Sequence, residues 1–342
     1  MASTLHVIAS TDRRGAEVFA SELVEALADL GHDGGLVAVA GSSSAAPLPL
    51  PDLGGLSVGA VRELRRLART HDRVVAHGST TLPACAIATI GGVPFVYRSI
   101  GDPRYWSSSG WRAARVRLLL GRAATVVALW PGAADELRRR GLDGRVVVIP
   151  NAVDTSAFRP PDAAERLAAR EALGLGVAEH VVLYLGSLSD EKNPGGAVEA
   201  CDGLAETVLV MAGDGPRRAE LAAAPRPAVR LVGAVDDARS LLWAADCLIL
   251  PSRTEGIPAA AIEAGACGLP VVATDVGGVS SVVLDGRTGR LVEPGSAHDL
   301  RTGVIEALAG SFDGALARSH CVEHFDLRAV ARQWDELLVS IG

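Results

Sequence analysis

The feature that most constrains the fold is an alternation of short apolar runs with stretches of helical periodicity along the 342-residue chain. Runs such as Leu5–Ser10 predict buried strands, because strands covered on both faces consist of short, continuous apolar segments. In the stretch that follows, Val18, Leu23 and Leu27 recur near helical spacing. Gly31 then suits a helix C-cap. Strands that alternate with helices predict an α/β fold, with a parallel sheet covered by helices on both faces.

The same alternation begins a second time at "HVVLYLGS" (180–187). The segment Ile149–Pro161 before it has the proline and polar content of an interdomain linker. A chain of this length is also too long for one small domain. We therefore expect two doubly wound domains in series. Their ligand sites are expected on the loops at the carboxyl ends of the strands, facing a shared crevice.

Composition narrows the class of protein. Apolar residues make up 49% of the chain and aromatic residues 4%, which is typical of a globular protein with a core of Ala, Val and Leu. The net charge of −7 argues against general nucleic-acid binding. The charge is uneven, at +3 for residues 1–155 and −10 for residues 156–342. This asymmetry indicates two domains with different surfaces.

Features of targeting and redox chemistry point to the cytoplasm. The first residues lack a basic segment followed by a long apolar core, so we expect no secretory signal. A run of about 18 apolar residues, which would mark a membrane span, is absent from the sequence. The cysteines are scattered without metal-ligand spacing, so we expect free thiols in a reducing compartment. They are Cys85, Cys201, Cys247, Cys267 and Cys321.

Lys192 is the only lysine among 33 basic residues. A sequence rich in Ala, Gly, Arg and Val is typical of a high-GC genome, so one lysine can survive by chance. The alternative is a site that needs a compact ammonium, which the wide planar guanidinium of arginine does not replace. Lys192 lies in "GSLSDEKNPGG" (186–196), a loop that follows an expected strand, and is therefore a candidate functional residue.

Two glutamates flank an expected helix start. Glu255 lies in a loop, and Glu263 follows eight residues later in the second turn of a helix. Between them Gly256 supplies a turn, and Pro258 suits the first helical position. A helix start offers unpaired N–H groups and a positive dipole end to an anion or to sugar hydroxyls. Carboxylates there suit hydroxyl pairs of a sugar or ribose, although spacing alone also fits two surface glutamates.

A set of motifs in order resembles the retaining GT-B glycosyltransferases of family 4. The resemblance covers nearly the whole chain, and the ordered set is more specific than any one motif. Its parts are "RRGAE" (13–17), "VVAHGST" (74–80), "VIPNAVDTSAF" (148–158), "LYLGSLSDEKN" (183–193), "MAGDGP" (211–216), "LVGAVDDARSLLWAADCLILPS" (231–252), "EGIPAAAIEA" (255–264) and the segment 268–295.

The resemblance implies a GT-B fold of two Rossmann-like domains facing a central crevice. The last helix is expected to return to the first domain. Residues 1–155 with 326–342 would then bind the acceptor, and residues 156–325 the donor. The implied reaction moves a sugar from a nucleoside-diphosphate sugar, with UDP favoured, to an acceptor hydroxyl with retention. No metal and no cofactor are expected, because no Asp-x-Asp motif stands where a metal would be required.

The resemblance also implies roles for single residues. Lys192 would lie against the donor diphosphate and neutralise charge on the leaving group. Glu263 would accept from the ribose hydroxyls, and Glu255 from hydroxyls of the donor sugar. His77 is a candidate catalytic histidine, although an isolated histidine at a strand end is often structural. Further donor-binding candidates are Gly15, Ser187, Arg253, Gly256, Ile257, Pro258, Ala259 and Val235.

Two positions depart from the family pattern. The arginine expected directly after the glycine of "LYLGS" is replaced by Ser187. Arg253 is one candidate for the missing cation, and Arg13 or Arg14 is another. The histidine usual near the sugar is replaced by Ile100.

The acceptor candidates lie in "VYRSIGDPRYW" (96–106), because first-domain loops bind acceptors in this family. They are Arg98, Asp102, Tyr105 and Trp106, and the alternative is a solvated loop with an aromatic anchor. The nearby segment Trp111–Ala124 carries four arginines beside apolar residues. We interpret it as a first-domain helix with its arginines in water, in preference to a helix lying on an anionic membrane. The acceptor itself, whether lipid, glycan or small molecule, stays open.

Other functions remain possible on the same residues. A sugar-nucleotide epimerase of this fold would need further acid and base groups around the sugar. A glycogen-type phosphorylase would need a lysine for pyridoxal phosphate, yet the only lysine lies in the diphosphate loop. A non-catalytic nucleotide-sugar-binding protein fits the two departures from the pattern. The presence of Lys192, Glu255 and Glu263 favours the enzyme.

Overall fold

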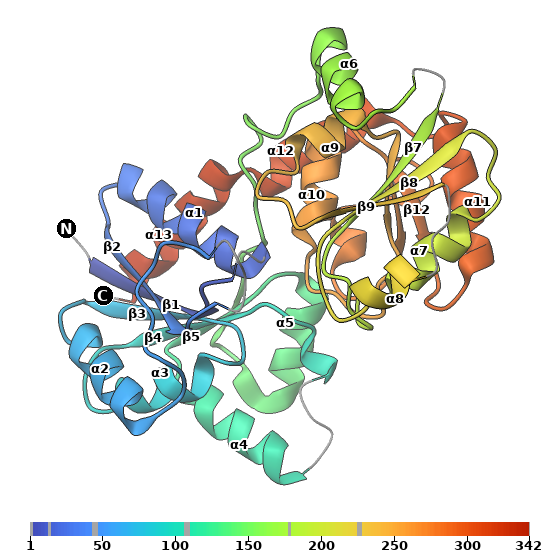
Figure 1. Cartoon of the computed structure of the whole chain (residues 1–342). Helices are drawn as coiled ribbons and strands as arrows, with labels where there is room; N and C mark the ends of the chain where they lie inside the picture. Colours follow the sequence, from blue (N-terminus) through green and yellow to red (C-terminus); the bar gives the residue numbers. More distant parts are fainter. Residues whose placement is uncertain are drawn as a thin grey trace. The chain divides into compact units, whose positions relative to one another are not determined.

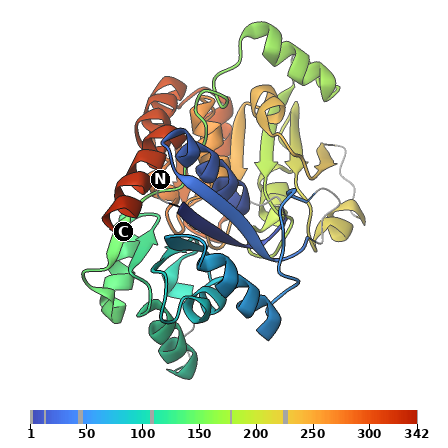
Figure 2. The ribbon, with the colours of Figure 1, turned by 90° about the vertical axis from the view of Figure 1, so that its left-hand side faces the viewer.

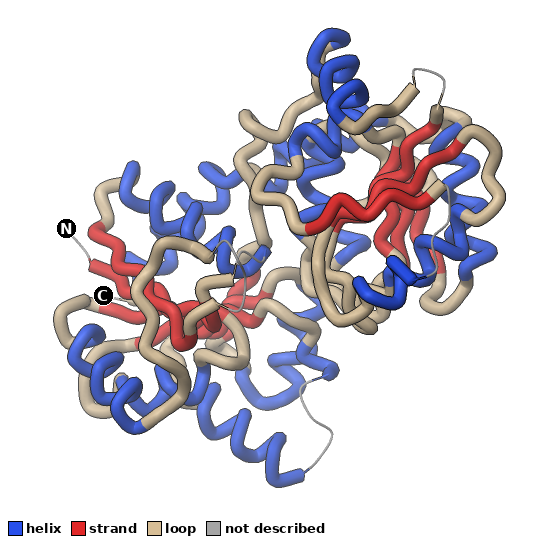
Figure 3. The backbone as a smooth tube through the Cα atoms, viewed as in Figure 1, coloured by secondary structure: helices blue, strands red, loops and turns tan. Residues whose placement is uncertain are grey.

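The computed structural model describes residues 3–12, 15–42, 47–105, 110–176, 179–223 and 228–341. The chain divides into two compact units (Figure 1). Unit 1 comprises residues 1–152 and 327–342, and unit 2 comprises residues 153–326. Each unit is built on its own six-stranded sheet (Figure 3). The α/β class and the parallel sheets predicted from the alternating pattern are confirmed.

The sheet of unit 1 has the strand order β2-β1-β3-β4-β5-β6, and every pair is parallel. The inner strands are buried along their whole length or nearly so, as continuous apolar runs require. The strands are β1 (Ser3–Ser10), β2 (Asp33–Ala40), β3 (Arg73–His77), β4 (Phe95–Ser99), β5 (Thr125–Ala128) and β6 (Val146–Val148).

Helices cover both faces of this sheet. In Figure 1, α1 (Gly15–Asp29) and α13 (Leu327–Ser340) lie on one face, and Figure 2 shows these two helices side by side. Phe19, Leu23 and Trp334 pack there against the strands as one apolar cluster. The other face carries α2 (Val58–Ala68), α3 (Leu82–Ala88) and α4 (Gly110–Leu120). The remaining elements are η1 (Pro103–Tyr105), α5 (Pro131–Leu137) and the π-helical turn η2 (Arg138–Leu142).

The end of α1 follows the sequence prediction. The helix ends at Asp29, and Gly31 has a φ of 90°. The amides of Gly31 and His32 donate to the carbonyls of Ala28 and Leu27, as in a glycine-terminated helix. His32 Nε2 then lies 2.6 Å from Asp335 Oδ1, which links this corner to α13.

The sheet of unit 2 has the order β12-β11-β10-β7-β8-β9, again with parallel pairs only. The strands are β7 (His180–Leu185), β8 (Thr207–Ala212), β9 (Val229–Gly233), β10 (Cys247–Leu250), β11 (Val271–Thr274) and β12 (Gly289–Val292).

The helices of unit 2 also lie on two faces. Side chains of α7 (Pro194–Cys201) and α11 (Ala297–Leu308) form an apolar cluster with β7, β8 and β10. In Figure 1, α9 (Arg239–Ala244), α10 (Ala259–Ala266) and α12 (Gly314–Phe325) lie on the opposite face. The remaining elements are α6 (Ala163–Ala172), α8 (Arg218–Ala223) and η3 (Val279–Ser281). Within the described residues, none of the helices has the length and apolarity needed to cross a membrane.

Candidate functional site

Backbone hydrogen bonds connect four loops at the carboxyl edge of the unit 2 sheet. Parallel strands end at the same edge, so the loops after β7, β8, β10 and β11 come together there. The amide of Leu188 donates to the carbonyl of Asp214 at 2.9 Å, and that of Arg253 to Glu191 at 2.8 Å. The amide of Gly278 donates to Gly256 at 2.8 Å. The loops predicted to bind the donor are therefore neighbours in the fold.

Two glycines allow these loops to touch. Gly213 has a φ of +145°, and a Cβ there would lie 1.8 Å from the carbonyl oxygen of Gly186. Gly277 has a φ of +61°, and its Cβ would lie 2.0 Å from the carbonyl oxygen of Glu255. No side chain fits at such separations, and L-residues rarely adopt this conformation. Close backbone contact across the edge thus depends on glycine.

Lys192 and Glu255 meet at this edge. Lys192 Nζ donates to Glu255 Oε2 at 2.5 Å. The Glu255 side chain is 5% exposed, whereas that of Lys192 is 28% exposed. Ser252 Oγ donates to the other carboxylate oxygen, Oε1, at 2.7 Å. The structure therefore brings the two predicted residues together and adds Ser252, which sequence reasoning missed.

The local sequence explains how Lys192 is held. The next residue, Asn193, adopts the left-handed conformation with a φ of 49°, which asparagine tolerates better than most residues. Its Nδ2 donates to the carbonyl of Pro251 at 3.1 Å, so the lysine loop is fixed to the loop that carries Glu255. Pro194 then opens α7, where its fixed φ and missing N–H cost nothing.

Tyr184 holds the loop that carries Lys192 through a hydrogen bond. Its hydroxyl donates to the carbonyl of Ser187 at 2.7 Å. Burial, and then the Glu255 carboxylate, raise the pKa of Tyr184, so the phenol stays a neutral donor. Ser187 Oγ lies 3.0 Å from Ser189 Oγ, which gives the loop two hydroxyls where the family pattern has a cation. Arg253, one candidate for the missing cation, is exposed.

The helix start after Glu255 differs by one residue from the prediction. The sequence placed Pro258 at the first helical position, but α10 begins at Ala259 and Pro258 precedes it with a ψ of 122°. The extended conformation carries the chain from the Glu255 loop into the helix. Ile257 and Pro258 are buried, and Gly256 and Ala259 are partly exposed. The first amides of a helix have no acceptor within it, so this end can meet an anion.

Glu263 lies in the second turn of α10, as predicted, and is half-buried. Burial, and then the Glu263 carboxylate, raise the pKa of Cys267 to about 12, so that carboxylate lies near the end of the helix. Val235 is partly exposed in the loop after β9. Contacts of Glu263 with a ribose and of Val235 with a base stay predictions.

His77, the third catalytic candidate, occupies a different environment from Lys192 and Glu255. It ends β3 with 2% of its surface exposed. Its Nε2 lies 3.1 Å from His6 Nδ1, and its ring stacks at 6.4 Å from that of Trp334. Burial, followed by the charges of His6 and Arg98, holds its pKa well below the ordinary value. His77 is therefore a neutral side chain packed inside unit 1, and its catalytic role stays a prediction.

Arg98, a predicted acceptor-binding residue, also lies inside unit 1. It is 1% exposed and pairs in register with His77 on the neighbouring strand. Its Nη2 donates to Asn151 Oδ1 at 2.9 Å, and its guanidinium lies 4.0 Å from the centroid of the Phe19 ring. Burial lowers its pKa to about 9, and Glu17 opposes that shift. Arg98 therefore lies in the unit 1 core, and its acceptor role stays a prediction.

The remaining first-unit candidates have mixed outcomes. Asp102 is buried, and Arg104 donates to it from its backbone amide at 2.9 Å and from its guanidinium. This turn supports η1 and leaves the acceptor role of Asp102 untested. Gly15 is the first residue of α1. Ile100 is partly buried. Arg13, Arg14, Trp106 and the side chain of Tyr105 lie outside the described residues.

The described residues contain neither a metal-binding cluster nor a disulfide. The described part of the chain contains no group of three His, Cys, Asp or Glu side chains placed to hold a metal ion. All five cysteines are buried and free of disulfides, as predicted. Burial raises their pKa values, with that of Cys201 near 12, so the thiols are protonated and unreactive at neutral pH.

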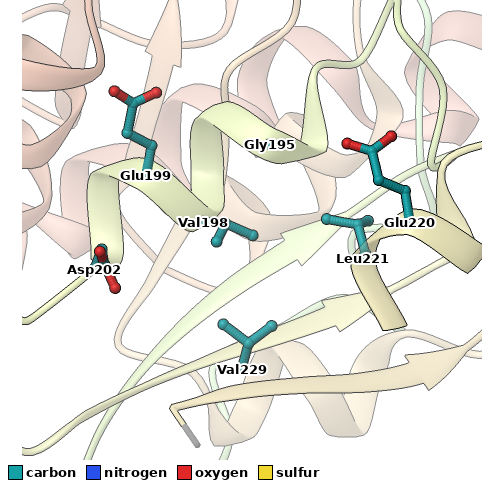
Figure 4. Close-up of a pocket in the computed structure, with 7 residues that line it drawn as sticks. All are labelled: Gly195, Val198, Glu199, Asp202, Glu220, Leu221 and Val229. Carbon is teal, nitrogen blue, oxygen red and sulfur yellow. The ribbon is translucent and has the colours of Figure 1, made fainter. Parts of the chain in front are cut away.

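A pocket of about 460 Å³ lies elsewhere in unit 2, between α7, α8 and β9. In Figure 4 the side chains of Val198, Leu221 and Val229 converge, while Glu199 and Glu220 point away from them. None of the predicted site residues lines it. Its carboxylates would repel a diphosphate, so the pocket is not the candidate donor site.

Family models match both units. The model described as Glycosyltransferase Family 4 matches residues 13–157, and the model described as Glycosyl transferases group 1 matches residues 179–310. Together they cover most of the chain.

Two relatives carry the name D-inositol 3-phosphate glycosyltransferase. The one from Catenulispora acidiphila, numbered 2, is 35% identical over 213 residues, which are 56% of this chain and 49% of the relative. The one from Xylanimonas cellulosilytica is 37% identical over 229 residues, 61% of this chain and 53% of the relative. The chain spans about half the length of the curated relatives it matches.

Solved structures show the fold. Anabaena HepE in complex with UDP-glucose has a TM-score of 0.85 at 21% identity, covering 99% of this chain and 100% of its own. Sucrose-phosphate synthase from Thermosynechococcus elongatus has a TM-score of 0.83 at 20% identity, covering 100% and 99%. The fold is the GT-B fold. With glycosyltransferase models matched in both units, the chain belongs to the group 1 and family 4 glycosyltransferases.

Proposed function

We propose that this protein transfers a sugar from a nucleoside-diphosphate sugar, with UDP as the favoured nucleotide, to an acceptor hydroxyl. We assign donor binding to unit 2. The observation that carries the proposal is the Lys192–Glu255 pair at the carboxyl edge of the unit 2 sheet, with Ser252 on the second carboxylate oxygen. The cation suits the anionic diphosphate of such a donor, and the neighbouring carboxylate can accept hydrogen bonds from the hydroxyls of its neutral sugar.

The pair also indicates how the donor is recognised. A lysine bound to a buried carboxylate neutralises it, which offsets part of the cost of removing both from water. A diphosphate would replace Glu255 as the partner of Lys192. The freed Oε2 would then accept from a sugar hydroxyl, while Ser252 keeps Oε1 in place. Each group exchanges one charged or polar partner for another, and no buried charge is left alone.

Catalysis follows from the same placement. As the glycosidic bond breaks, negative charge grows on the departing diphosphate, and the Lys192 ammonium stabilises it. We propose that the acceptor hydroxyl attacks on the face from which the diphosphate leaves, giving retention. The departing phosphate oxygen takes the acceptor proton. The new bond joins the acceptor oxygen to the anomeric carbon, the old carbon–oxygen bond breaks, and neither a covalent enzyme intermediate nor a metal is needed.

Nucleotide binding is the first test. Thermal shifts would be measured with UDP, GDP, ADP and dTDP on the wild type, Lys192→Ala and Glu306→Gln. The last variant breaks the ion pair between Arg290 of β12 and Glu306 of α11, and serves as the matched control. One diphosphate is expected to stabilise the wild type and the control by about 2.7 kcal/mol at a hundredfold excess over its dissociation constant. In Lys192→Ala the shift should collapse.

Turnover distinguishes the alternatives. UDP-glucose would be incubated with candidate acceptors, D-inositol 3-phosphate first because the relatives bear its name, with and without EDTA. A new glycoside whose anomeric configuration matches the donor supports the proposal. Donor recovered with an inverted ring hydroxyl would indicate an epimerase. Binding without turnover against a broad acceptor panel would indicate a nucleotide-sugar-binding protein.

A further inference from the structure

The two helical layers of unit 1 carry opposite charge. Helices α2, α3 and α4 contain six arginines and one acidic residue, Glu63. Helices α1 and α13, on the other side of the same sheet, contain two arginines and six acidic residues. Unit 1 therefore has a basic face and an acidic face. The unit's modest net charge hides this separation.

Apolar side chains are exposed on the basic face. Trp111 and Leu118 of α4 are 66% and 72% exposed, and Ile87 and Ile90 beside them at the end of α3 are also exposed. Trp111 and Leu118 are two helical turns apart, so they lie on one side of α4. The guanidinium of Arg115 lies 5.4 Å from the centroid of the Trp111 ring. Large exposed apolar groups gathered in this way mark an interaction surface.

A groove of about 790 Å³ runs along α4. Its lining is mostly apolar and includes Val116, Leu118 and Leu142. The charged side chains that line it are Arg117, Arg122 and Arg140, and none of the described residues along it is acidic. The groove combines apolar lining with guanidinium groups. That combination fits an amphiphile with a negatively charged head group.

Several arginines of this face are anchored at one nitrogen and leave others for a partner. Arg122 Nε donates to the carbonyl of Ala86 at 3.1 Å, and Arg65 Nη2 donates to that of Ile90 at 3.0 Å. A guanidinium has five N–H donors in a planar fork that matches phosphate oxygens. These backbone contacts place the cations around the exposed isoleucines and α4.

We infer that this basic face, defined by Arg62, Arg65, Arg69, Arg115, Arg117 and Arg122 with Ile87, Ile90, Trp111 and Leu118, binds the surface of a membrane that contains anionic phospholipid. The arginines meet the phosphate groups, and Trp111 and Leu118 enter the interfacial region, where tryptophan is favoured. Binding is peripheral. This inference departs from the sequence-based preference for a helix with its arginines simply in water.

The observations favour lipid over nucleic acid as the partner. Arginines alone would suit either polyanion. Exposed tryptophan and leucine beside an apolar groove instead match a surface with a polar boundary and an apolar interior. The acidic face on α1 and α13 would turn away from such a membrane, which gives the bound unit one orientation.

Vesicle sedimentation tests this inference on the whole chain. Vesicles of phosphatidylcholine alone would be compared with vesicles of phosphatidylcholine and phosphatidylglycerol. The wild type is expected to bind the mixed vesicles at least about tenfold more tightly, and salt should weaken that binding. Two double variants, Arg115→Glu with Arg117→Glu and Trp111→Ser with Leu118→Ser, should each lose about tenfold or more.

The matched control places the same kinds of change on the acidic face. Arg332→Glu with Val339→Ser alters an exposed arginine and an exposed valine of α13 and should leave vesicle binding unchanged. Melting temperature and nucleotide binding, which should be unaltered in all three variants, report folding. The inference is overturned if the wild type ignores mixed vesicles, if the control loses as much as the others, or if the protein binds RNA and not vesicles.

Discussion

The carboxyl edges of the two sheets carry similar polar residues in different surroundings. At the edge of unit 2, Lys192 and Glu255 form an ion pair whose ammonium remains partly exposed. In unit 1, His77 and Arg98 stand near the equivalent strand ends but are almost completely buried, against His6, Asn151 and aromatic rings. A polar residue at a parallel-strand end is therefore insufficient evidence of a site. The measured difference is that the unit 2 pair includes an ammonium with 28% of its side-chain surface exposed, whereas His77 and Arg98 are at most 2% exposed.

The largest effect on stability is expected from Arg98→Ala. The buried guanidinium donates to Asn151 and interacts with the charge of Glu17. The substitution would leave both buried polar groups without this cation. The free energy of unfolding should fall by about 3–5 kcal/mol, as for a broken buried ion pair. Urea denaturation followed by circular dichroism measures the loss. A variant as stable as the wild type would mean that unit 1 does not depend on this cation.

The largest effect on turnover is expected from Glu255→Gln. The amide preserves the shape of the side chain but removes the negative charge to which Lys192 and Ser252 donate. Turnover should therefore drop by about 10²–10³-fold, which corresponds to roughly 2.7–4 kcal/mol of transition-state stabilisation. The melting temperature should change little, because glutamine keeps the shape of Glu255 and the ammonium of Lys192, which loses its charged partner, is partly exposed. His77→Gln is the contrasting variant, with lower stability but similar turnover in the folded protein. Equal losses of turnover in Glu255→Gln and His77→Gln would show that the two sheet edges do not differ in function.

Acid should destabilise unit 1 in a defined range of pH. Burial, followed by the charges of His32, Arg98 and His71, lowers the pKa of His6 to about 3, and His77 shifts in the same direction. Below pH about 6.5 these histidines become protonated in the unfolded chain but stay neutral in the folded unit. The free energy of unfolding therefore falls as the pH drops toward 3. The slope is on the order of 1.4 kcal/mol per pH unit for each such histidine.

Melting temperatures between pH 7 and pH 4 would test this, with His6→Gln as the variant and His298→Gln on α11 as the control. The His6 variant should show a shallower decline with acid than either the wild type or the control. Parallel declines in all three proteins would assign acid sensitivity to other groups.

The smallest effect is expected from Ser252→Ala. The hydroxyl satisfies one oxygen of a buried carboxylate without making the ion pair itself. Its loss should weaken donor affinity or turnover by about 10- to 100-fold, since a hydrogen bond to a charged group contributes about 1.5–3 kcal/mol. Kinetics with UDP-glucose measure the change. No change would show that water replaces the serine adequately.

Much of the fold follows from patterns local in the sequence. The alternation of strands and helices, the helix end near Gly31 and the convergence of Lys192 with Glu255 all depend on short segments or on the rule that parallel strands end together. Ser252 was missed because a serine three residues before a glutamate carries no periodic signal. Pro258 was misplaced by one residue, since helix boundaries depend on how the flanking loop packs.

The burial of His77 and Arg98 depends on partners that are distant in the sequence. His77 meets His6 from a strand 71 residues away, and Arg98 meets Asn151 at a separation of 53 residues. Nothing in the local sequence records whether a side chain at a strand end turns inward or toward solvent. Trp334, which stacks on His77, comes from the last helix of the chain. Such contacts become visible only in three dimensions.

The ion pair at the unit 2 edge has a consequence for the end of a catalytic cycle. Once the sugar has left, a nucleoside diphosphate retains the group that attracts Lys192 but no longer offers hydroxyls to Glu255. The Glu255 carboxylate then competes with the phosphate for the Lys192 ammonium, which it contacts at 2.5 Å. Glu255 therefore competes with the product nucleoside diphosphate for binding to Lys192. Under the proposed function, this competitor hastens product release and limits inhibition by accumulated nucleotide.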